Sequence, residues 1–420
     1  MKRLSLALLL LFLCLGVVAQ NIQNYQSYIK ELTSKKYEGR GYYNEGDKKA
    51  AVYISKQYEI IGAKPIVDSY FQDFTFNVNV FHGNMKLSVD GKDLIAGKEF
   101  VMREFSNGAK GEYKLYYIDQ KNFNIEKIIE DFNKPEFENT FIVIDFTFLR
   151  THSKEINQLY KTKMKGIIKV WDTPLKFYKA YSSKVIDQTI VWVDNTFPKN
   201  AKKIKIDVDN EFLKDYKSSN VIAQIKGKSS TDSTIVFVAH YDHLGHLGKD
   251  IYYQGANDNA SGTAMLLSLA EYYSKKENTP NYTIVFLSVA GEEVGLLGST
   301  YYTEHPLLPL DKIKYLINLD MIADNSKDVY VEISPEGEKG LEKFNSINTK
   351  LNLFTKLDKG ELAGNSDHFP FANKHVPAIF FIMETGDAFK IYHTLQDNYE
   401  NLYLDNYQKM FTLLTEFLKE

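Results

Sequence analysis

The chain has 420 residues, of which 44% are hydrophobic and 25% are charged, as in an ordinary folded protein. This length exceeds a typical single domain, so it excludes a peptide-sized or disulfide-dependent fold and indicates more than one folding unit. The 51 Lys and Arg residues nearly balance the 54 Asp and Glu residues, so the chain has no strong basic field and nucleic acid is not an expected partner.

The first predicted element is a signal peptide over residues 1–19. Lys2 and Arg3 precede the apolar run Leu4–Ala19, and polar residues follow at once. A membrane-spanning helix needs about 20 apolar residues, so this run favours cleavage and export, to a periplasmic or extracellular location, over stable membrane insertion. The single cysteine, Cys14, lies inside the segment, so the mature chain has no disulfide.

Two further segments precede the C-terminal half. Residues 20–70 carry apolar side chains at three- and four-residue spacing, which predicts helices that belong to the C-terminal domain. Residues 71–217 change to short apolar or alternating runs, which indicates a β-rich inserted domain. The strands expected in this insert are Phe74–Phe81, Tyr113–Ile118, Phe141–Phe146, Gly166–Trp171 and Thr189–Asp194.

Residues 218–420 alternate strands with helices, which predicts an α/β domain with a mainly parallel mixed sheet and helices on both faces. The expected strands are Val221–Ile225, Thr234–Ala239, Thr283–Val289, Tyr315–Leu319 and Ala378–Met383. The expected helices are Gly262–Lys275, Val294–His305, Glu338–Leu351 and Asn406–Leu418. Ligands of such sheets bind beyond the carboxyl ends of the strands, so the site is expected there.

Histidines and carboxylates gather where these strands end. The groups are His240 with Asp242, Asp258 in a turn before a helix, Glu292 with Glu293, Asp320, and His393 beside Tyr392. Taken singly, each has an ordinary structural role, since Asp258 can shape a turn and Glu292 and Glu293 can favour a helix N-terminus. Together on one edge, several buried carboxylates would repel one another unless a divalent cation neutralised them. Two imidazoles and three carboxylates suit zinc, and one shared carboxylate predicts a two-metal hydrolytic centre.

The motifs His240-Tyr-Asp242, Asn257-Asp258-Asn259-Ala-Ser-Gly, Gly291-Glu292-Glu293-Val-Gly-Leu-Leu-Gly-Ser, Leu319-Asp320-Met321 and Tyr392-His393-Thr394 resemble, in order, those of the M28 family of co-catalytic zinc peptidases. The resemblance spans Asn220 to Glu420, and Glu38-Gly39-Arg40 also resembles the start of family members. It implies a zinc-exopeptidase-like fold for the catalytic domain at 218–420. The chain departs from the family in the loop after His393, which reads Thr394-Leu395-Gln396-Asp397.

The resemblance implies a site with two Zn²⁺ ions. His240 and Asp320 would bind one ion, Glu293 and His393 the other, and Asp258 would bridge them. Glu292 would be the general base. We expect Asp242 to accept the second ring N–H of His240. By the same resemblance, Tyr392 would donate to the oxyanion.

Residues near these motifs have lesser expected roles. His243 and His246 follow His240 closely, and we expect them to be solvated or to support the ligands from outside. Asp367 or His368, in another segment that resembles the family, is expected to support the cleft or the substrate.

The implied function is that of an exported aminopeptidase that acts on peptides with a free N-terminus. The motifs leave a carboxypeptidase or dipeptidase open, although residues 220–420 contain no arginine to bind a substrate carboxylate. Glutaminyl cyclisation with one zinc is disfavoured by the complete ligand set. A non-catalytic peptide-binding protein is disfavoured because a structural site does not need Glu292. The insert at 71–217 loosely resembles a protease-associated domain, and the oligomeric state is left open.

Overall fold

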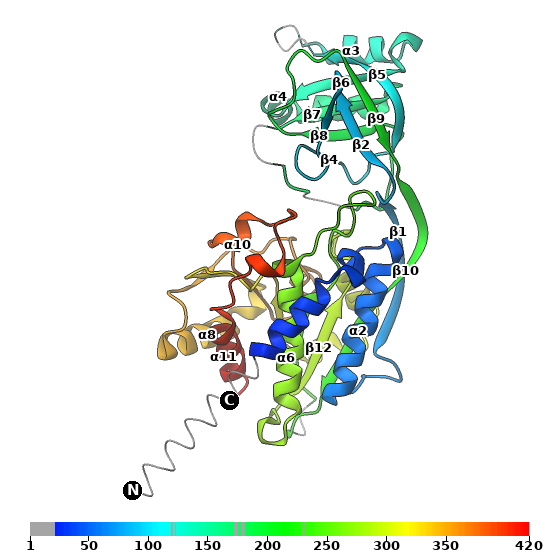
Figure 1. The fold of residues 1–420 in the computed structure, drawn as a ribbon. Coiled ribbons are helices and arrows are strands. Elements are labelled where there is room, and N and C mark those ends of the chain that lie inside the picture. The colour runs from blue at the N-terminus through cyan, green and yellow to red at the C-terminus, as the bar shows by residue number, and fades with distance from the viewer. Residues whose placement is uncertain are drawn as a thin grey trace, which may run out of the picture.

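The computed structural model describes residues 22–118, 121, 123–171, 175–177, 181–229 and 232–419, and the predicted signal peptide lies outside them. The described chain forms two parts, each built on a sheet (Figure 1). No helix within these ranges is long and apolar enough to cross a membrane.

The first sheet has the strand order β1-β10-β12-β11-β13-β16-β14-β15 within the described residues. Its central strands β12, β11, β13 and β16 are parallel. The pairs β1–β10, β10–β12 and β14–β16 are antiparallel, and β14 and β15 are parallel. The strands are β1 (Phe71–Val80), β10 (Glu211–Ile225), β11 (Thr234–His240), β12 (Thr283–Val289), β13 (Ile313–Leu319), β14 (Val329–Ile333), β15 (Leu357–Lys359) and β16 (Ala378–Ile382). This confirms the predicted mainly parallel mixed sheet.

Helices cover both faces of this sheet because its central strands are apolar on both sides. Along β11, Phe237 packs in one hydrophobic cluster and its neighbours Val236 and Val238 pack in another. The first face carries residues 22–32, α2 (Gly46–Ile61), α6 (Gly262–Ser274), α8 (Glu338–Leu351) and α11 (Tyr407–Phe417). The second face carries α7 (Leu297–Glu304) and α9 (His368–Ala372). The α/β class expected from the sequence is therefore confirmed.

The second sheet has the order β3-β2-β9-β5-β6-β7-β8-β4, with β5 to β8 mutually parallel. Its strands are β2 (Met85–Val89), β3 (Lys92–Leu94), β4 (Phe100–Met102), β5 (Ala109–Tyr117), β6 (Thr140–Asp145), β7 (Gly166–Val170), β8 (Thr189–Val193) and β9 (Lys203–Val208). Short helices α3 (Ile125–Phe132), α4 (Phe146–Thr151) and α5 (Ser153–Ile156) accompany them. The insert is thus a mixed α/β unit with a large β content.

The strands that open and close the predicted insert belong to the first sheet. β1 pairs with β10, and β10 continues into pairing with β12 through Val221↔Ser288. Residues 71–80 and 211–217 therefore extend the first sheet, and the strands of the second sheet run only from Met85 to Val208. The alternating pattern of β1 does not show to which sheet it belongs, because an edge strand of either sheet would have the same alternation of apolar and polar residues.

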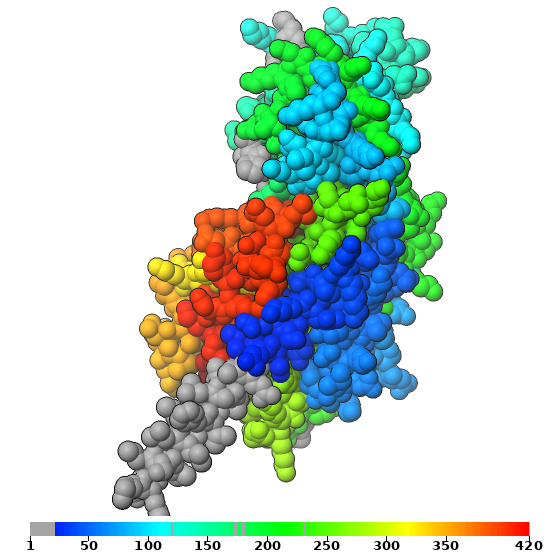
Figure 2. Space-filling model, viewed as in Figure 1, coloured from blue at the N-terminus to red at the C-terminus, as the bar shows by residue number. Residues whose placement is uncertain are grey.

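The two parts lie end to end, joined by the long strands β1 and β10 (Figure 1). On the face seen in Figure 2, the dark blue N-terminal residues lie against the red C-terminal ones. This contact includes the stacked rings of Tyr25 and Tyr407, whose centroids are 4.1 Å apart. The second part also reaches the first through Phe177, whose backbone N–H donates to the carbonyl of His393 at 3.1 Å.

Candidate metal centre

The site lies at the edge where the parallel strands of the first sheet end. His240 is the last residue of β11 and pairs in register with Val289, the last residue of β12. Glu292 and Glu293 follow β12, and Asp320 follows β13. Because parallel strands end on one edge of a sheet, the register alone brings these side chains together.

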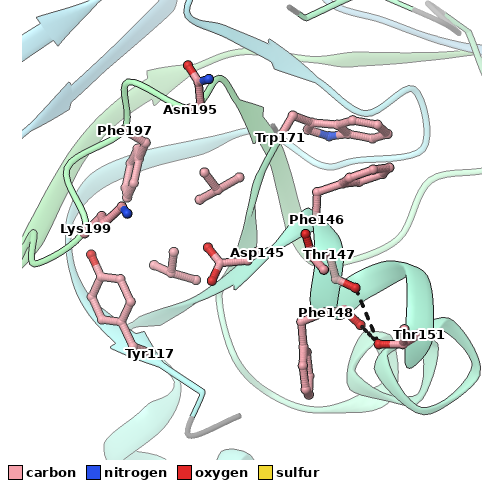
Figure 3. A pocket seen from close by; sticks show the side chains of 12 residues that line it. Tyr117, Asp145, Phe146, Thr147, Phe148, Thr151, Trp171, Asn195, Phe197 and Lys199 are labelled. Carbon is pink, nitrogen blue, oxygen red and sulfur yellow. Dashed lines mark hydrogen bonds between the residues drawn. The ribbon is translucent and has the colours of Figure 1, made fainter. Parts of the chain in front are cut away.

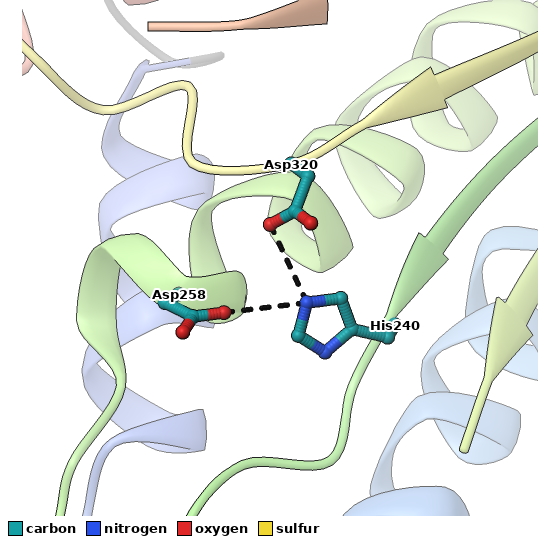
Figure 4. A group of neighbouring side chains, drawn as sticks. All are labelled: His240, Asp258 and Asp320. Atoms are coloured by element: carbon teal, nitrogen blue, oxygen red, sulfur yellow. Dashed lines mark ion pairs between the residues drawn. The ribbon is translucent and has the colours of Figure 1, made fainter. Parts of the chain in front are cut away.

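The first group of ligating side chains is His240, Asp258 and Asp320 (Figure 4). The His240 Nε2 atom lies 3.3 Å from Asp258 Oδ1 and 3.3 Å from Asp320 Oδ1. All three residues are buried. Asp258 reaches the strand ends because it sits in the turn Ala256–Ser261, which leads directly into α6.

The second group uses the other oxygen of Asp258. His393 Nε2 lies 2.9 Å from Asp258 Oδ2 and 3.6 Å from Glu293 Oε2. Asp258 therefore faces His240 with one oxygen and His393 with the other. The structure brings together all five side chains that the sequence analysis selected as metal ligands.

The charges of this cluster show why it attracts cations. Burial lowers the pKa of His393, but the carboxylates of Glu293 and Asp258 outweigh burial and raise that pKa to about 10. Burial raises the pKa of Glu293, but His393 and His243 outweigh burial and lower that pKa to about 2. The imidazoles thus retain protons because the carboxylates need positive charge nearby. A divalent ion satisfies the same need, and this donor set of imidazoles and carboxylates fits zinc.

Glu292 lies beside these groups and keeps some solvent access, as its intermediate exposure shows. Burial raises its pKa well above the ordinary value, and the carboxylates of Glu293, Asp367 and Asp320 add to this effect while His240 opposes it. A carboxylate that takes up a proton readily and is not needed as a ligand has the chemistry of a general base.

Asp242 occupies a different position from the one predicted for it. The Nδ1 atom of His240 lies 3.1 Å from the Asp242 backbone carbonyl, whereas the Asp242 carboxylate is 3.7 Å away. That carboxylate accepts the Tyr42 hydroxyl at 2.6 Å and the backbone N–H groups of Glu292 and Glu293 at 3.3 Å each. Asp242 therefore holds the turn that carries Glu292 and Glu293, and its carbonyl orients His240.

Tyr392, predicted to donate to the oxyanion, stacks on His393 with ring centroids 3.6 Å apart. Asp367 is fully buried near the site, and burial raises its pKa to about 7. His368, also fully buried, lies with its Nε2 atom 3.3 Å from Glu332 Oε2. His246 lies 2.7 Å from Glu38 through Nε2, outside both ligand groups.

His243 is expected from the sequence to be solvated or to support the ligands from outside. The expectation that it is solvated is wrong. His243 is fully buried, and its Nδ1 atom lies 2.9 Å from Glu293 Oε1 and 3.6 Å from Asp258 Oδ2. Its spacing of three residues from His240 gave no reason to place it in the cluster. A turn after β11 brings it there, with its backbone N–H donating to the Arg40 carbonyl at 3.3 Å.

Two further residues that hold the site were not assigned a role from the sequence. Arg40 is fully buried and donates to five backbone carbonyls, including those of Tyr241 at 2.7 Å, Gly255 at 2.7 Å and Asp258 at 3.3 Å. Asp397 accepts the backbone N–H groups of Asn257 at 2.7 Å and Asp258 at 3.1 Å. The sequence signal that could have identified Arg40 and Asp397 is that each is a charged residue in or near a recognised motif.

A pocket elsewhere in the chain does not share this chemistry. It has a volume of about 490 Å³ and lies in the second part, where β5, β6 and β7 end (Figure 3). Phe146 stacks on Trp171 at its rim, with ring centroids 4.0 Å apart. Its described lining residues include one carboxylate, Asp145, and no histidine. Among the residues that the structure describes, the groups of side chains that could hold a metal ion lie at the edge of the first sheet.

Comparison with known proteins places the catalytic half in one family. Residues 220–418 match the sequence model described as "Peptidase family M28". The chain is 30% identical over 213 residues to "Aminopeptidase YwaD" of Bacillus subtilis, an alignment that covers 48% of this chain and 44% of that protein. It is also 30% identical over 237 residues to "Glutamate carboxypeptidase 2 homolog" of Caenorhabditis elegans, covering 49% and 30%. The chain thus spans less than half the length of these curated relatives.

Solved structures share the fold over nearly the whole chain. A zinc aminopeptidase from Bacillus subtilis superposes with a TM-score of 0.70 at 21% identity and covers 94% of both chains. An aminopeptidase from Aneurinibacillus sp. strain AM-1 gives a TM-score of 0.66 at 18% identity, covering 94% of this chain and 92% of that one. Coverage of this extent includes the second part as well as the M28 segment.

Proposed function

Because residues 220–418 belong to peptidase family M28, we propose that the protein is an exported zinc aminopeptidase that removes residues from peptides with a free N-terminus. One observation carries the proposal. Asp258 faces His240 with one carboxylate oxygen and His393 with the other, while Asp320 lies 3.3 Å from His240 and Glu293 lies 3.6 Å from His393. Glu292 directly precedes Glu293 in the chain.

The donor set supports a site for two zinc ions. His240 and Asp320 would hold one ion, Glu293 and His393 the other, and Asp258 both. When bound, such a pair of ions polarises the peptide carbonyl and activates the attacking water. Burial of three acidic ligands at one point is costly without compensating charge, and two divalent ions would supply that charge.

The protein's own groups would handle the proton. Glu292 takes the proton of the attacking water and returns it to the amine that leaves, so one carboxylate serves as base and then as acid. Asp242 holds the Glu292 and Glu293 backbone in place through two N–H groups. Tyr392 would donate its hydroxyl to the oxygen that gains charge in the transition state.

The N-terminal direction of cleavage rests on the relatives. "Aminopeptidase YwaD" of Bacillus subtilis, a relative at 30% identity, is named for this activity, and the acidic groups around the site suit a substrate ammonium. Since the chain spans less than half of that relative, the activity of the whole protein is part of the proposal.

A carboxypeptidase is the second candidate, and one contact favours it. Lys176, from the second part, holds its ammonium group 5.8 Å from the ring centroid of Tyr392 and 5.8 Å from that of Phe389. Residues 220–420 have no arginine, so Lys176 is a cation near the site that can bind a substrate carboxylate. The carboxypeptidase homologue of Caenorhabditis elegans agrees with this alternative.

Mass spectrometry of digested peptides separates the two activities. The zinc-loaded mature protein is incubated with one peptide in four forms, in which the N-terminus is free or acetylated and the C-terminus is free or amidated. Stepwise N-terminal loss that stops on acetylation, whatever the C-terminus, supports the aminopeptidase. Trimming that survives acetylation but stops on amidation supports the carboxypeptidase and refutes our proposal. The Glu292→Gln variant controls for contaminating peptidases.

A further inference from the structure

His243 is placed for a role that the M28 motifs do not assign to it. It is fully buried, three residues past His240, in a segment whose residues 240–245 are all buried. Its ring lies against Gly255, where a Cβ atom would stand 2.3 Å from the His243 Cδ2 atom. Gly255 also has a φ of +60°, a backbone conformation that favours glycine. The absence of a side chain at residue 255 therefore leaves the space that the imidazole fills.

The Nδ1 atom of this ring points at the ligands of the second ion position. It lies 2.9 Å from Glu293 Oε1 and 3.6 Å from Asp258 Oδ2. His393 approaches the same two carboxylates from the other side, closer to Asp258 Oδ2 at 2.9 Å and farther from Glu293 at 3.6 Å, where it faces Oε2. Both imidazoles thus share Asp258 Oδ2 and flank Glu293, and their ring centroids are 5.9 Å apart.

These distances suit donors that share one ion. Zinc bonds of about 2.0–2.2 Å in tetrahedral geometry separate neighbouring ligand atoms by about 3.3–3.6 Å. The four nitrogen-to-oxygen distances, 2.9 to 3.6 Å, scatter about that range. We propose that His243 Nδ1 is a fourth protein ligand of the zinc ion held by Asp258, Glu293 and His393. This inference rests on the proposed two-zinc site and adds a ligand to it.

A fourth ligand would make the two ion positions unequal. The position of His240, Asp258 and Asp320 has three protein ligands and keeps an open place for water, as catalytic zinc sites do. The position with His243 would have four protein ligands, which leaves it less room for water than the other position. Glu292 feels the charges of both positions, those of His240 and Asp320 from the open one and that of Glu293 from the other. We therefore expect one tightly held zinc ion and one that exchanges more readily.

The competing role for His243 is that of a hydrogen-bond donor that fixes Glu293 from outside. A variant can separate the two roles, because His243→Asn keeps an N–H donor near the place of Nδ1 but is a poor zinc ligand. Loss of an outer partner typically weakens metal affinity 10- to 100-fold, and Asn retains that partner. His246→Asn is the matched control, since His246 is a nearby histidine that contacts Glu38 and neither ligand group.

Zinc affinity is measured by competition with a chelator of known affinity. We expect His243→Asn to weaken the tighter site by more than about 100-fold, and His246→Asn to leave both sites unchanged. Tight binding of two ions by His243→Asn would overturn the fourth ligand while leaving the proposed function intact. A wild-type protein that binds no zinc pair would overturn both.

A second measurement needs no variant and so does not depend on how well one folds. The wild-type protein is labelled with ¹⁵N-histidine and loaded with ¹¹³Cd in place of zinc. We expect one cadmium resonance coupled to two histidine nitrogens and one coupled to a single nitrogen. Two resonances that each couple to one nitrogen would refute the ligand role of His243.

Discussion

Replacing Arg40 should disconnect the two chain segments that carry His240 and Asp258. Its guanidinium donates to the carbonyls of Leu32 at 3.2 Å, Tyr241 at 2.7 Å, Gln254 at 2.6 Å, Gly255 at 2.7 Å and Asp258 at 3.3 Å. Burial lowers the pKa of Arg40 to about 10, although Asp258 and three other carboxylates oppose this shift, so the group stays charged at neutral pH.

The expected cost of Arg40→Met follows from those five bonds. A buried carbonyl left without a donor costs about 1–3 kcal/mol, so even if water or relaxation rescues most of them, two orphaned carbonyls cost about 2–6 kcal/mol. Folded domains have only about 5–15 kcal/mol of net stability. Arg40→Lys retains the charge but offers three donors in place of a planar fork of five, so its cost should be smaller.

Urea unfolding of the zinc-loaded protein measures these costs, and chelator competition on the same samples measures zinc affinity. Arg150→Met is the matched control, because Arg150 is exposed and its loss should stay within about 0.5 kcal/mol. The order Arg40→Met, Arg40→Lys, wild type should hold for both stability and zinc affinity. An Arg40→Met protein whose free energy of unfolding lies within about 1 kcal/mol of wild type, with unchanged zinc affinity, would refute the role of Arg40 in holding these segments together.

Three further outcomes follow from the same contacts. Asp397→Ala removes the acceptor for the Asn257 and Asp258 backbones, and chelator competition should show zinc binding weakened about 10- to 100-fold. Burial raises the pKa of Asp47 to about 7, above its unfolded value near 4, so the folded chain binds this proton more tightly. The free energy of unfolding should thus fall as pH rises from about 4 to 7, and Asp47→Asn should flatten that slope in urea titrations. Zinc at about 1,000 times its Kd should add about 4 kcal/mol per ion, and equal unfolding curves with and without chelator would contradict this.

The elements of the catalytic domain could be predicted from the sequence because their patterns are local. The buried strand Thr234–His240 and the helix Gly262–Ser274 follow from apolar runs and three-to-four-residue spacing. The meeting of His240, Glu293 and Asp320 followed from parallel pairing, which places successive strand ends on one edge. These inferences needed no knowledge of how loops fold.

What could not be predicted depends on loops and on contacts distant in the chain. His243 enters the cluster because the segment after His240 brings its ring against Gly255. The spacing of His243 from His240 does not predict this contact. Arg40 binds carbonyls more than 200 residues away, and backbone acceptors leave no mark in a sequence. The assignment of β1 and β10 to the first sheet likewise rests on long-range pairing.

The most direct test of the account is the zinc content and turnover of Glu292→Gln measured on one sample. Glutamine has the size of glutamate but cannot take up the proton of the attacking water. The account predicts two zinc ions per chain, as in wild type, with kcat lowered about 10²- to 10⁴-fold. Turnover near the wild-type rate with two ions bound would contradict the role of Glu292 as the base, and loss of zinc together with activity would make Glu292 a ligand instead.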